Sequence, residues 1–405
     1  MVMKAFAIPL LMILFLLTGC TTKDGNIVSS QVGAGSVEIT STVPDARIFV
    51  DHKDTGKRTP AVIENLPEGS HVIHLFLSKY EVLPESARIT IKPGSVTAID
   101  FELNKSPSEG NIQITTTPPG ALVFVDKLPF GRTPLSIEGL LSGTHRLRII
   151  RGGYNEIRQT VQINTDNLLA LSYSLELKHF VLIEHFSNTD CPPCPVADAT
   201  IEAVLHDFGV DSAAGLTYHP NFPGSEDPFF LAAESDNLAR MSFYRLLAVP
   251  TVVVDGVFTI LSPNNLEPQL RDAMQTRFQV SPPATVDFHD FWETYRSSDK
   301  IAGSVVIEAL EDLPSDVFLR IALIEKEVIF STSPGTNGQT RFTDVLRKFY
   351  PNPDGTPISL QNGENRTVEF QFDRQPEWQG DLEVIAFLQK KSTKEVLQAA
   401  WTVLE

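Results

Sequence analysis

Two cysteines stand two residues apart in the run Cys191-Pro192-Pro193-Cys194, in a chain that has three cysteines in all. This spacing is typical of thiol–disulfide exchange, in which one thiolate attacks a partner and the second thiol resolves the mixed disulfide. A disulfide across so small a ring adds little stability, because the loop-closure contribution grows with ring length. A structural zinc site needs four ligands, and the chain has no second cysteine pair. The spacing therefore predicts redox chemistry.

The prolines around this pair indicate that it opens a helix. Pro192, Pro193 and Pro195 fit a first helical turn, where a missing N–H costs nothing. Unpaired N–H groups and the helix dipole at such an end favour a thiolate. We therefore predict that Cys191 is the exposed attacking thiolate and that Cys194, less exposed, is the resolving thiol.

The elements expected around the pair follow from apolar periodicity. A short apolar run predicts a buried strand before the cysteines, and a helix, a strand, a helical stretch, a hairpin turned at Asp-Gly and a last helix follow them. This order resembles the thioredoxin family. The segments, in chain order, are 180–186, 196–208, 214–219, 228–247, 249–257 and 266–277.

The resemblance to thioredoxin-like proteins implies a substrate-binding proline opposite the cysteines. Members of that family place a cis-proline there, and the backbone of the residue before it pairs with an extended substrate. Pro250 heads an apolar strand 56 residues after Cys194 (250 − 194), where that element belongs, although an ordinary trans proline also fits a strand start. We therefore expect Val249 and Thr251 to contact substrate, together with Pro192 and Pro193.

A proton relay to Cys194 would need a titratable group on the strand that leads to the cysteines. A carboxylate at Glu184, with its pKa raised by burial, is the candidate that we favour. His185 is its rival, because strand alternation turns only one of the two towards the site. His219 ends the next strand and should emerge at the same edge, although both histidines also fit structural roles.

The N-terminus resembles that of bacterial lipoproteins. Lys4 precedes an apolar run, residues 5–17, which is too short to span a bilayer comfortably and ends in Leu-Thr-Gly-Cys. The resemblance implies a signal peptide over residues 1–19, lipidation of Cys20, and a tether over residues 20–35. Because no Asp follows Cys20, the resemblance further implies the outer membrane.

The next region contains an internal repeat with an offset of 74 to 75 residues. Pro44-Asp45-Ala46-Arg47-Ile48-Phe49-Val50-Asp51 recurs as Pro119-Gly120-Ala121-Leu122-Val123-Phe124-Val125-Asp126, and the Thr-Pro, Gly-x-His and Tyr positions that follow also recur. Short alternating segments between turns predict small antiparallel β domains. The pattern resembles the PEGA module, which implies two β-sandwiches, at 36–103 and 110–177. The recurring His71 and His145 fit structural roles.

The rest of the chain completes a four-domain prediction. Residues 178–280 are expected to form the α/β thioredoxin-like domain, and residues 281–405, which are strand-rich, a C-terminal all-β sandwich. Together, 178–405 resembles a family of outer-membrane lipoproteins that join these two domains. The fold class is therefore two small all-β sandwiches, one α/β domain and one C-terminal β-sandwich.

The composition of the chain limits the classes of partner that it can bind. The chain has 405 residues and a formal net charge of −17, which argues against nucleic acid, because phosphate neutralisation needs clustered Lys and Arg. The expected partners are client proteins with thiols or disulfides, a redox partner protein, and the membrane through the anchor; no cofactor and no resident metal are expected. Two alternatives stay open, a non-catalytic lipoprotein that binds envelope polymer or protein, and a copper-handling protein that uses Cys191, Cys194 and His219.

Overall fold

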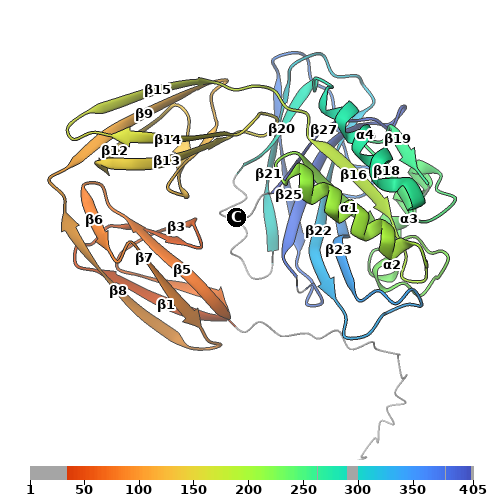
Figure 1. The fold of residues 1–405 in the computed structure, drawn as a ribbon, viewed down its shortest axis with the longest axis horizontal. Coiled ribbons are helices and arrows are strands. Elements are labelled where there is room, and N and C mark those ends of the chain that lie inside the picture. Colours follow the sequence, from red (N-terminus) through yellow and green to blue (C-terminus); the bar gives the residue numbers. More distant parts are fainter. Residues whose placement is uncertain (1–33, 262, 290–299, 379, 403–405) are drawn as a thin grey trace, which may run out of the picture.

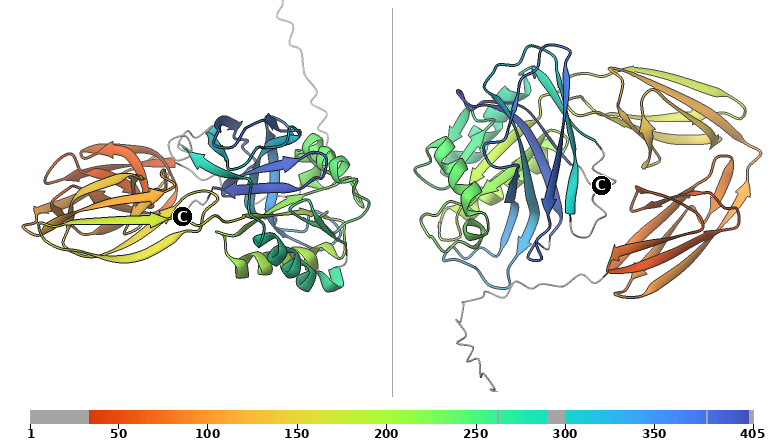
Figure 2. Two further views of the ribbon diagram at one scale, coloured as in Figure 1. Left: turned by 90° about the horizontal axis from the view of Figure 1, so that it is seen from above. Right: turned by 180° about the vertical axis from the view of Figure 1, so that it is seen from behind.

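The computed structural model describes residues 34–405 except 262, 290–299, 379 and 403–405, so the predicted signal peptide and the lipidation site at Cys20 lie outside the described residues. Two β units follow one another along the chain, and a larger body with all the helices stands beside them (Figures 1 and 2). Within the part of the chain that is described, no helix is long and apolar enough to cross a membrane.

The first β unit packs two four-stranded sheets around one apolar core. Their strand orders are β4-β1-β8-β6 and β3-β2-β5-β7. Because β1 and β8 run parallel, the unit is a mixed sandwich and departs from the purely antiparallel prediction. Its strands are β1 (Ala34–Ser41), β2 (Arg47–Val50), β3 (Lys53–Arg58), β4 (Ala61–Pro67), β5 (Gly69–Phe76), β6 (Tyr80–Leu83), β7 (Ser86–Ile91) and β8 (Val96–Lys105).

The second β unit repeats this plan, as the sequence predicts. Its sheets have the orders β12-β9-β15 and β11-β10-β13-β14, and β9 pairs with β15 in parallel. Residues with positive φ form the same tight turn in both copies, Asp51-His52 and Asp126-Lys127. The strands are β9 (Glu109–Thr117), β10 (Leu122–Val125), β11 (Leu128–Arg132), β12 (Leu135–Leu141), β13 (Gly143–Ile150), β14 (Ile157–Ile163) and β15 (Leu168–Ser174).

The elements around the cysteines appear in the predicted order. Strand β16 lies between β17, which is parallel to it, and β18, which is antiparallel and turns into β19 at Asp255-Gly256. Helices α1 and α4 pack on one face of these strands. The elements are β16 (Val181–Phe186), α1 (Cys194–Phe208), β17 (Ala213–Tyr218), α2 (Pro228–Ala232), α3 (Glu234–Tyr244), β18 (Thr251–Val254), β19 (Phe258–Ile260), the 3-10 turn η1 (Pro263–Asn265) and α4 (Leu266–Phe278).

The C-terminal strands form two layers around the largest core cluster. One layer is the sheet β20-β21-β25, and the other contains β22, β23, β26 and β27. The strands are β20 (Ala284–His289), β21 (Lys300–Ala309), β22 (Val317–Ile329), β23 (Arg341–Tyr350), β24 (Thr356–Ile358), β25 (Asn365–Asp373), β26 (Leu382–Lys390) and β27 (Val396–Trp401).

The predicted boundary at residue 280 lies between two separate core clusters, but a third cluster crosses it. Strand β17 pairs with β23 at Thr217 and Val345, which joins the strands of both regions into one nine-stranded sheet. One apolar cluster also contains side chains from both, such as Phe186 of β16 and Phe387 of β26. The helix-bearing part and the C-terminal layers therefore share buried surface and should fold as one body.

Candidate functional site

The two cysteines form a disulfide at the start of α1. The Sγ atoms of Cys191 and Cys194 are 2.11 Å apart and the Cα atoms 5.4 Å apart. Cys194 is the first residue of the helix, Pro193 precedes it as the N-cap, and Cys191 ends the loop that leaves β16. The pair therefore lies at the positive end of the helix dipole, as the sequence predicts, where a thiolate is stabilised.

The structure contradicts the prediction that Cys191 is exposed. Cys191 is 1 % exposed and Cys194 is 0 % exposed. Pro192 between them is exposed and Pro193 is half-buried, so this side of the pair faces solvent through the prolines. The reason for the burial is that loops distant in sequence pack on residues 188–190, directly before Cys191.

The first of these loops follows β17. The Asn188 side-chain amide donates to the carbonyl oxygens of Pro220, at 2.8 Å, and Gly224, at 2.9 Å. The backbone N–H of Thr189 donates to the carboxylate of Asp227 at 2.8 Å. Because Asn188 and Asp227 are fully buried, this loop fixes the backbone that leads into the cysteines.

The second loop, residues 331–340, comes from the C-terminal layers and joins β22 to β23. The Asn337 backbone N–H donates to the carbonyl of Thr189 at 3.0 Å, and its side chain donates to the carbonyl of Asn188. The Thr336 backbone N–H donates to the carboxylate of Asp190 at 2.8 Å. The C-terminal region therefore touches the approach to the disulfide.

His185 lies on the α1 face of β16. Its Nδ1 atom is 3.3 Å from a carboxylate oxygen of Asp198, and Asp198 is four residues, or one turn, after Cys194. Burial lowers the pKa of His185 and His219 lowers it further, although the charge of Asp198 acts in the opposite direction. The imidazole is therefore neutral at neutral pH, and its Nε2 atom has no hydrogen-bond partner among the described residues.

Glu184 faces the opposite side of the sheet. Its carboxylate accepts hydrogen bonds from Tyr218, at 2.8 Å, from Tyr244, and from both Nε and Nη2 of Arg240. Although burial opposes the charged form, Glu184 raises the pKa of Arg240, so the guanidinium stays charged. Strand alternation thus points Glu184 away from α1, and the geometry favours its rival His185 as the group beside the helix.

The predicted substrate-binding residues lie at the start of β18. Thr251 pairs with Phe186, the last residue of β16, so Pro250 stands at the sheet edge where the chain turns towards the cysteines. The Val249–Pro250 peptide bond is cis, as the thioredoxin resemblance implies. Val249 is half-buried, Thr251 is buried, and Leu247 just before them is fully exposed.

His219 emerges at the same edge as the cysteines but is held in a buried pair. Its Nδ1 atom is 2.8 Å from Asp227, whose pKa is lowered by the charge and hydrogen bond of His219 against the effect of burial. No group of three or more His, Cys, Asp or Glu side chains in the described ranges could hold a metal ion. The copper alternative therefore has no donor set of that size among these residues.

The sequence interpretation missed Asp198, Asp227 and the loop 331–340. Asp198 had a signal, because its position one turn after Cys194 places it on the same side of the helix. Asp227 had a weaker one, as an Asp directly before Pro228 is a typical helix N-cap, and its carboxylate accepts from Phe229 and Phe230. The loop had none, since it lies about 140 residues further along the chain.

Both β repeats match the model of the PEGA domain, over residues 34–107 and 109–179, so the chain contains two PEGA domains and is a largely β, multidomain protein. No curated protein is similar enough to count as a match.

Three solved structures illustrate the wider similarity. HBP35 of Porphyromonas gingivalis has 15 % identity and a TM-score of 0.44, with 56 % of this chain and 76 % of that chain covered. Protein AGR_C_4864 from Agrobacterium tumefaciens has 16 % identity and a TM-score of 0.38, over 56 % and 96 %. GBS52, the minor pilin of Streptococcus agalactiae, has 9 % identity and a TM-score of 0.16, over 35 % and 95 %. None of these scores shows the function of the chain.

Proposed function

We propose that this chain is an exported thiol–disulfide oxidoreductase that exchanges disulfides with client proteins through Cys191 and Cys194. The observation that carries the proposal is the bond between these two cysteines at the N-terminus of α1, directly after the buried strand β16. A dithiol held at a helix N-terminus has the environment that activates a thiolate.

The surrounding elements support a thioredoxin-like unit. The central strand β16 has a parallel neighbour on one side and an antiparallel hairpin on the other, and two helices pack on one face. This arrangement is the one that the resemblance to thioredoxin-like proteins implies. Pro250 directly precedes the antiparallel strand β18, whose first residue, Thr251, pairs with Phe186 at the end of β16. This part of the proposal concerns residues 178–280, which share a core with the C-terminal layers.

Oxidation of a client by the cysteine pair takes two thiolate attacks. A client thiolate attacks the Sγ atom of Cys191, the Cys191–Cys194 bond breaks, and its electron pair leaves on the sulfur of Cys194, which takes up one proton. A second thiolate of the client then attacks the client sulfur of the mixed disulfide, which closes a disulfide in the client and releases Cys191 as a thiolate. The client loses two electrons and the cysteine pair gains two; a redox partner protein with a disulfide must reoxidise the pair. The reverse sequence reduces a client disulfide.

His185 is suited to accept the proton of Cys194 in the reducing direction. When Cys194 resolves a mixed disulfide its thiol must lose a proton, and a neutral imidazole whose Nε2 has no partner among the described residues can take it. Asp198 then stabilises the imidazolium that forms. We therefore transfer the relay role from Glu184 to His185.

The location of this chemistry is also a proposal. The motif Leu17-Thr18-Gly19-Cys20 supports a lipid anchor on Cys20 in the cell envelope, on the outer membrane, and the two PEGA domains would then separate the redox unit from the bilayer. Replacing Cys20 by Ala should release the protein from the membrane fraction.

The test is catalysis by the purified full chain. The wild type should accelerate the reduction of a protein disulfide by dithiothreitol, Cys191→Ser should abolish the acceleration, and Cys194→Ser should accumulate a mixed disulfide with the client. A Cys191→Ser protein as active as the wild type would contradict the proposal.

The burial of Cys191 favours the competing proposal, a non-catalytic envelope lipoprotein that binds polymer or protein. In that case the disulfide would stay closed in the presence of clients, and neither cysteine variant would change any exchange rate.

A further inference from the structure

The outer face of one sheet in the second PEGA domain carries two adjoining pockets. One opens between this sheet and the C-terminal layers, and the other opens towards His52 of the first domain. Arg148 lines both pockets, which together are here called the basic groove. Its cations include Lys127, Arg132, Arg146, Arg148, Arg158 and Lys178.

Strand register explains why these cations share one face. Arg148 on β13 stands opposite Phe124 on β10 and opposite Arg158 on β14, and Arg146 stands opposite Thr160. Directly opposed residues of neighbouring strands project to the same side of a sheet. Arg146, Arg148 and Arg158 therefore project from one face of this sheet, whereas Lys127 lies in the turn between β10 and β11 and Lys178 lies between β15 and β16.

The charge of the groove is opposite to that of the molecule. The chain has 33 Lys and Arg against 50 Asp and Glu. Each pocket is lined by four Lys or Arg side chains, seven in total because Arg148 is shared, against three carboxylates, all in the first pocket. A local excess of one sign in a concave site attracts ligands of the opposite sign.

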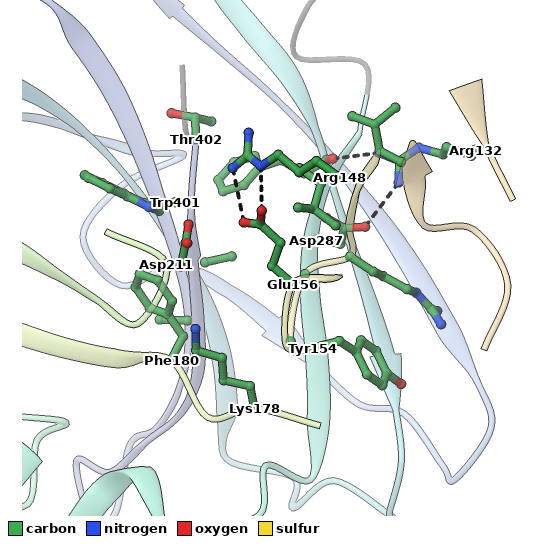
Figure 3. Close-up of a pocket in the computed structure, with 18 residues that line it drawn as sticks. Arg132, Arg148, Tyr154, Glu156, Lys178, Phe180, Asp211, Asp287, Trp401 and Thr402 are labelled. Carbon is green, nitrogen blue, oxygen red and sulfur yellow. Dashed lines mark hydrogen bonds and ion pairs between the residues drawn. The ribbon is translucent and has the colours of Figure 1, made fainter. Parts of the chain in front are cut away.

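Three of these cations lack an intramolecular ion pair. Among the described residues, no carboxylate lies within ion-pair distance of Lys127, Arg146 or Lys178, although the charge of Asp126 acts on Arg146 and those of Asp211 and Glu156 act on Lys178. Arg148, by contrast, is held by Glu156 at 2.8 Å. Lys178 is half-buried, and burial lowers its pKa against the opposing charges of Asp211 and Glu156. Figure 3 shows its side chain extending beside Phe180. A cation placed in this way would be stabilised by an anionic group of a ligand.

The rest of the first pocket has groups suited to sugar hydroxyls. Glu156, Asp211 and Asp287 offer acceptors, and Tyr154 and Trp401 offer ring surface (Figure 3). The indole Nε1 of Trp401 has no hydrogen-bond partner among the described residues. The three carboxylates accept hydrogen bonds from hydroxyls, which a sugar chain offers in greater number than a DNA strand does.

We propose that the basic groove binds an acidic glycan, in which carboxylate-bearing sugars contact Lys127, Arg146 and Lys178 and hydroxyls contact the acceptors of the first pocket. The first PEGA domain would not have an equivalent site of its own. Its counterparts of Lys127 and Arg148 are His52 and His74 (127 − 75 and 148 − 74), and burial lowers the pKa of both histidines. The proposal is independent of the redox function.

The experiment is calorimetric titration of the full chain with a short oligogalacturonate at low ionic strength. Lys127→Glu/Arg146→Glu should weaken binding about tenfold or more, because it reverses two unpaired charges. Lys178→Met should weaken it by a smaller factor. The matched control Arg88→Glu/Lys92→Glu makes the same change in net charge at exposed positions of the first domain and should leave affinity within about twofold.

Two further probes decide the ligand class. A neutral maltooligosaccharide of equal length should not bind, and a single-stranded DNA oligonucleotide should bind more weakly than the oligogalacturonate. Equal binding of DNA, equal losses in the control variant, or no binding of the acidic glycan would overturn the proposal. The disulfide-exchange rate of Lys127→Glu/Arg146→Glu should equal that of the wild type, which keeps this test separate from the redox proposal.

Discussion

Two neighbouring residues on opposite faces of strand β16 differ in how far their polar atoms are hydrogen-bonded. On the C-terminal side, the carboxylate of Glu184 accepts hydrogen bonds from Tyr218, Tyr244 and Arg240. On the α1 side, His185 has one carboxylate neighbour at 3.3 Å, and its Nε2 atom has no partner among the described residues.

This difference separates a structural network from a reactive one. A fully satisfied buried ion pair stabilises one arrangement of the core, and removing one partner leaves an uncompensated charge. A buried polar atom without a partner needs another explanation, and the proposed acceptance of a proton from the thiol of Cys194 supplies one. Glu184 therefore should matter for stability, and His185 for chemistry.

The largest expected effect concerns the Glu184 network. Glu184→Gln should lower the free energy of unfolding by about 3–5 kcal/mol, because Arg240 is then left buried without a carboxylate. Urea unfolding followed by intrinsic fluorescence measures this. Glu202→Gln, which breaks an exposed pair with Arg341, is the control and should cost about 1 kcal/mol or less. Similar losses in both variants would remove the distinction.

The second effect sharpens the chemical side of the comparison. His185→Gln should slow the resolution of a mixed disulfide by about 100-fold at neutral pH, because the proposed proton acceptor on the α1 face of β16 is lost. Quenched-flow trapping of the mixed disulfide gives the rate. His206→Gln alters an exposed histidine in the last turn of α1 and should leave the rate unchanged. A His185→Gln rate within twofold of the wild type would return His185 to a structural role.

The third effect concerns His145 of the second PEGA domain, which, unlike His185, has an acceptor at each ring nitrogen. His145 donates from Nδ1 to Asp126 at 2.6 Å, and its Nε2 lies 2.8 Å from the carbonyl of Leu141, so both partners are acceptors and the ring must be doubly protonated. The hydrogen bond to Asp126 raises the pKa of His145 above 6.5, against the effect of burial.

The sign of the pH dependence follows from this shift. The contribution of His145 to stability is fully present below pH 6.5, its unfolded pKa, and is lost as pH rises through the higher folded pKa. Burial acts to raise the pKa of Asp126, but His145 and the Arg146 N–H lower it below 3.8, so its contribution is lost as pH falls through that lower folded value.

The free energy of unfolding of the second PEGA domain within the full chain should therefore fall by about 1 kcal/mol from pH 6 to pH 9. Thermal unfolding at each pH measures this change. His145→Gln should remove this dependence. A dependence that persists in His145→Gln would contradict the assignment.

The smallest effect concerns the loop 331–340. Asn337→Ala removes its side-chain hydrogen bond to the carbonyl of Asn188 and should speed client attack on Cys191 by about threefold, because one bonded contact costs roughly 1 kcal/mol. Stopped-flow reduction by a peptide thiol measures this rate. Asn362→Ala in another exposed turn is the control. Slower attack in Asn337→Ala would show that the loop assists access to the disulfide.

Local features of the site could be predicted from the sequence, and long-range ones could not. The start of α1 near Cys194, the Asp255-Gly256 turn and the two repeats depend on neighbouring residues and on periodicity. Alternation along β16 could not decide between Glu184, which we favoured, and its rival His185, because a period of two does not say which face meets the helix.

The burial of Cys191 and the shared core depend on contacts between distant segments. Asn337 contacts Thr189 across 148 residues (337 − 189), and Gln389 contacts Arg240 across 149. No local propensity reports such pairings, since they arise only when the C-terminal layers pack against β16 and β17.

The most direct test of the central claim is the redox equilibrium of Cys191 and Cys194 in the purified full chain. Thiol trapping after incubation in graded glutathione and dithiothreitol buffers reports the fraction reduced. The account predicts one reversible two-electron transition between the bonded and dithiol forms, whose midpoint distinguishes a reductase, at low potential, from an oxidase or isomerase. A disulfide that stays closed in every buffer under native conditions and opens only on unfolding would contradict it.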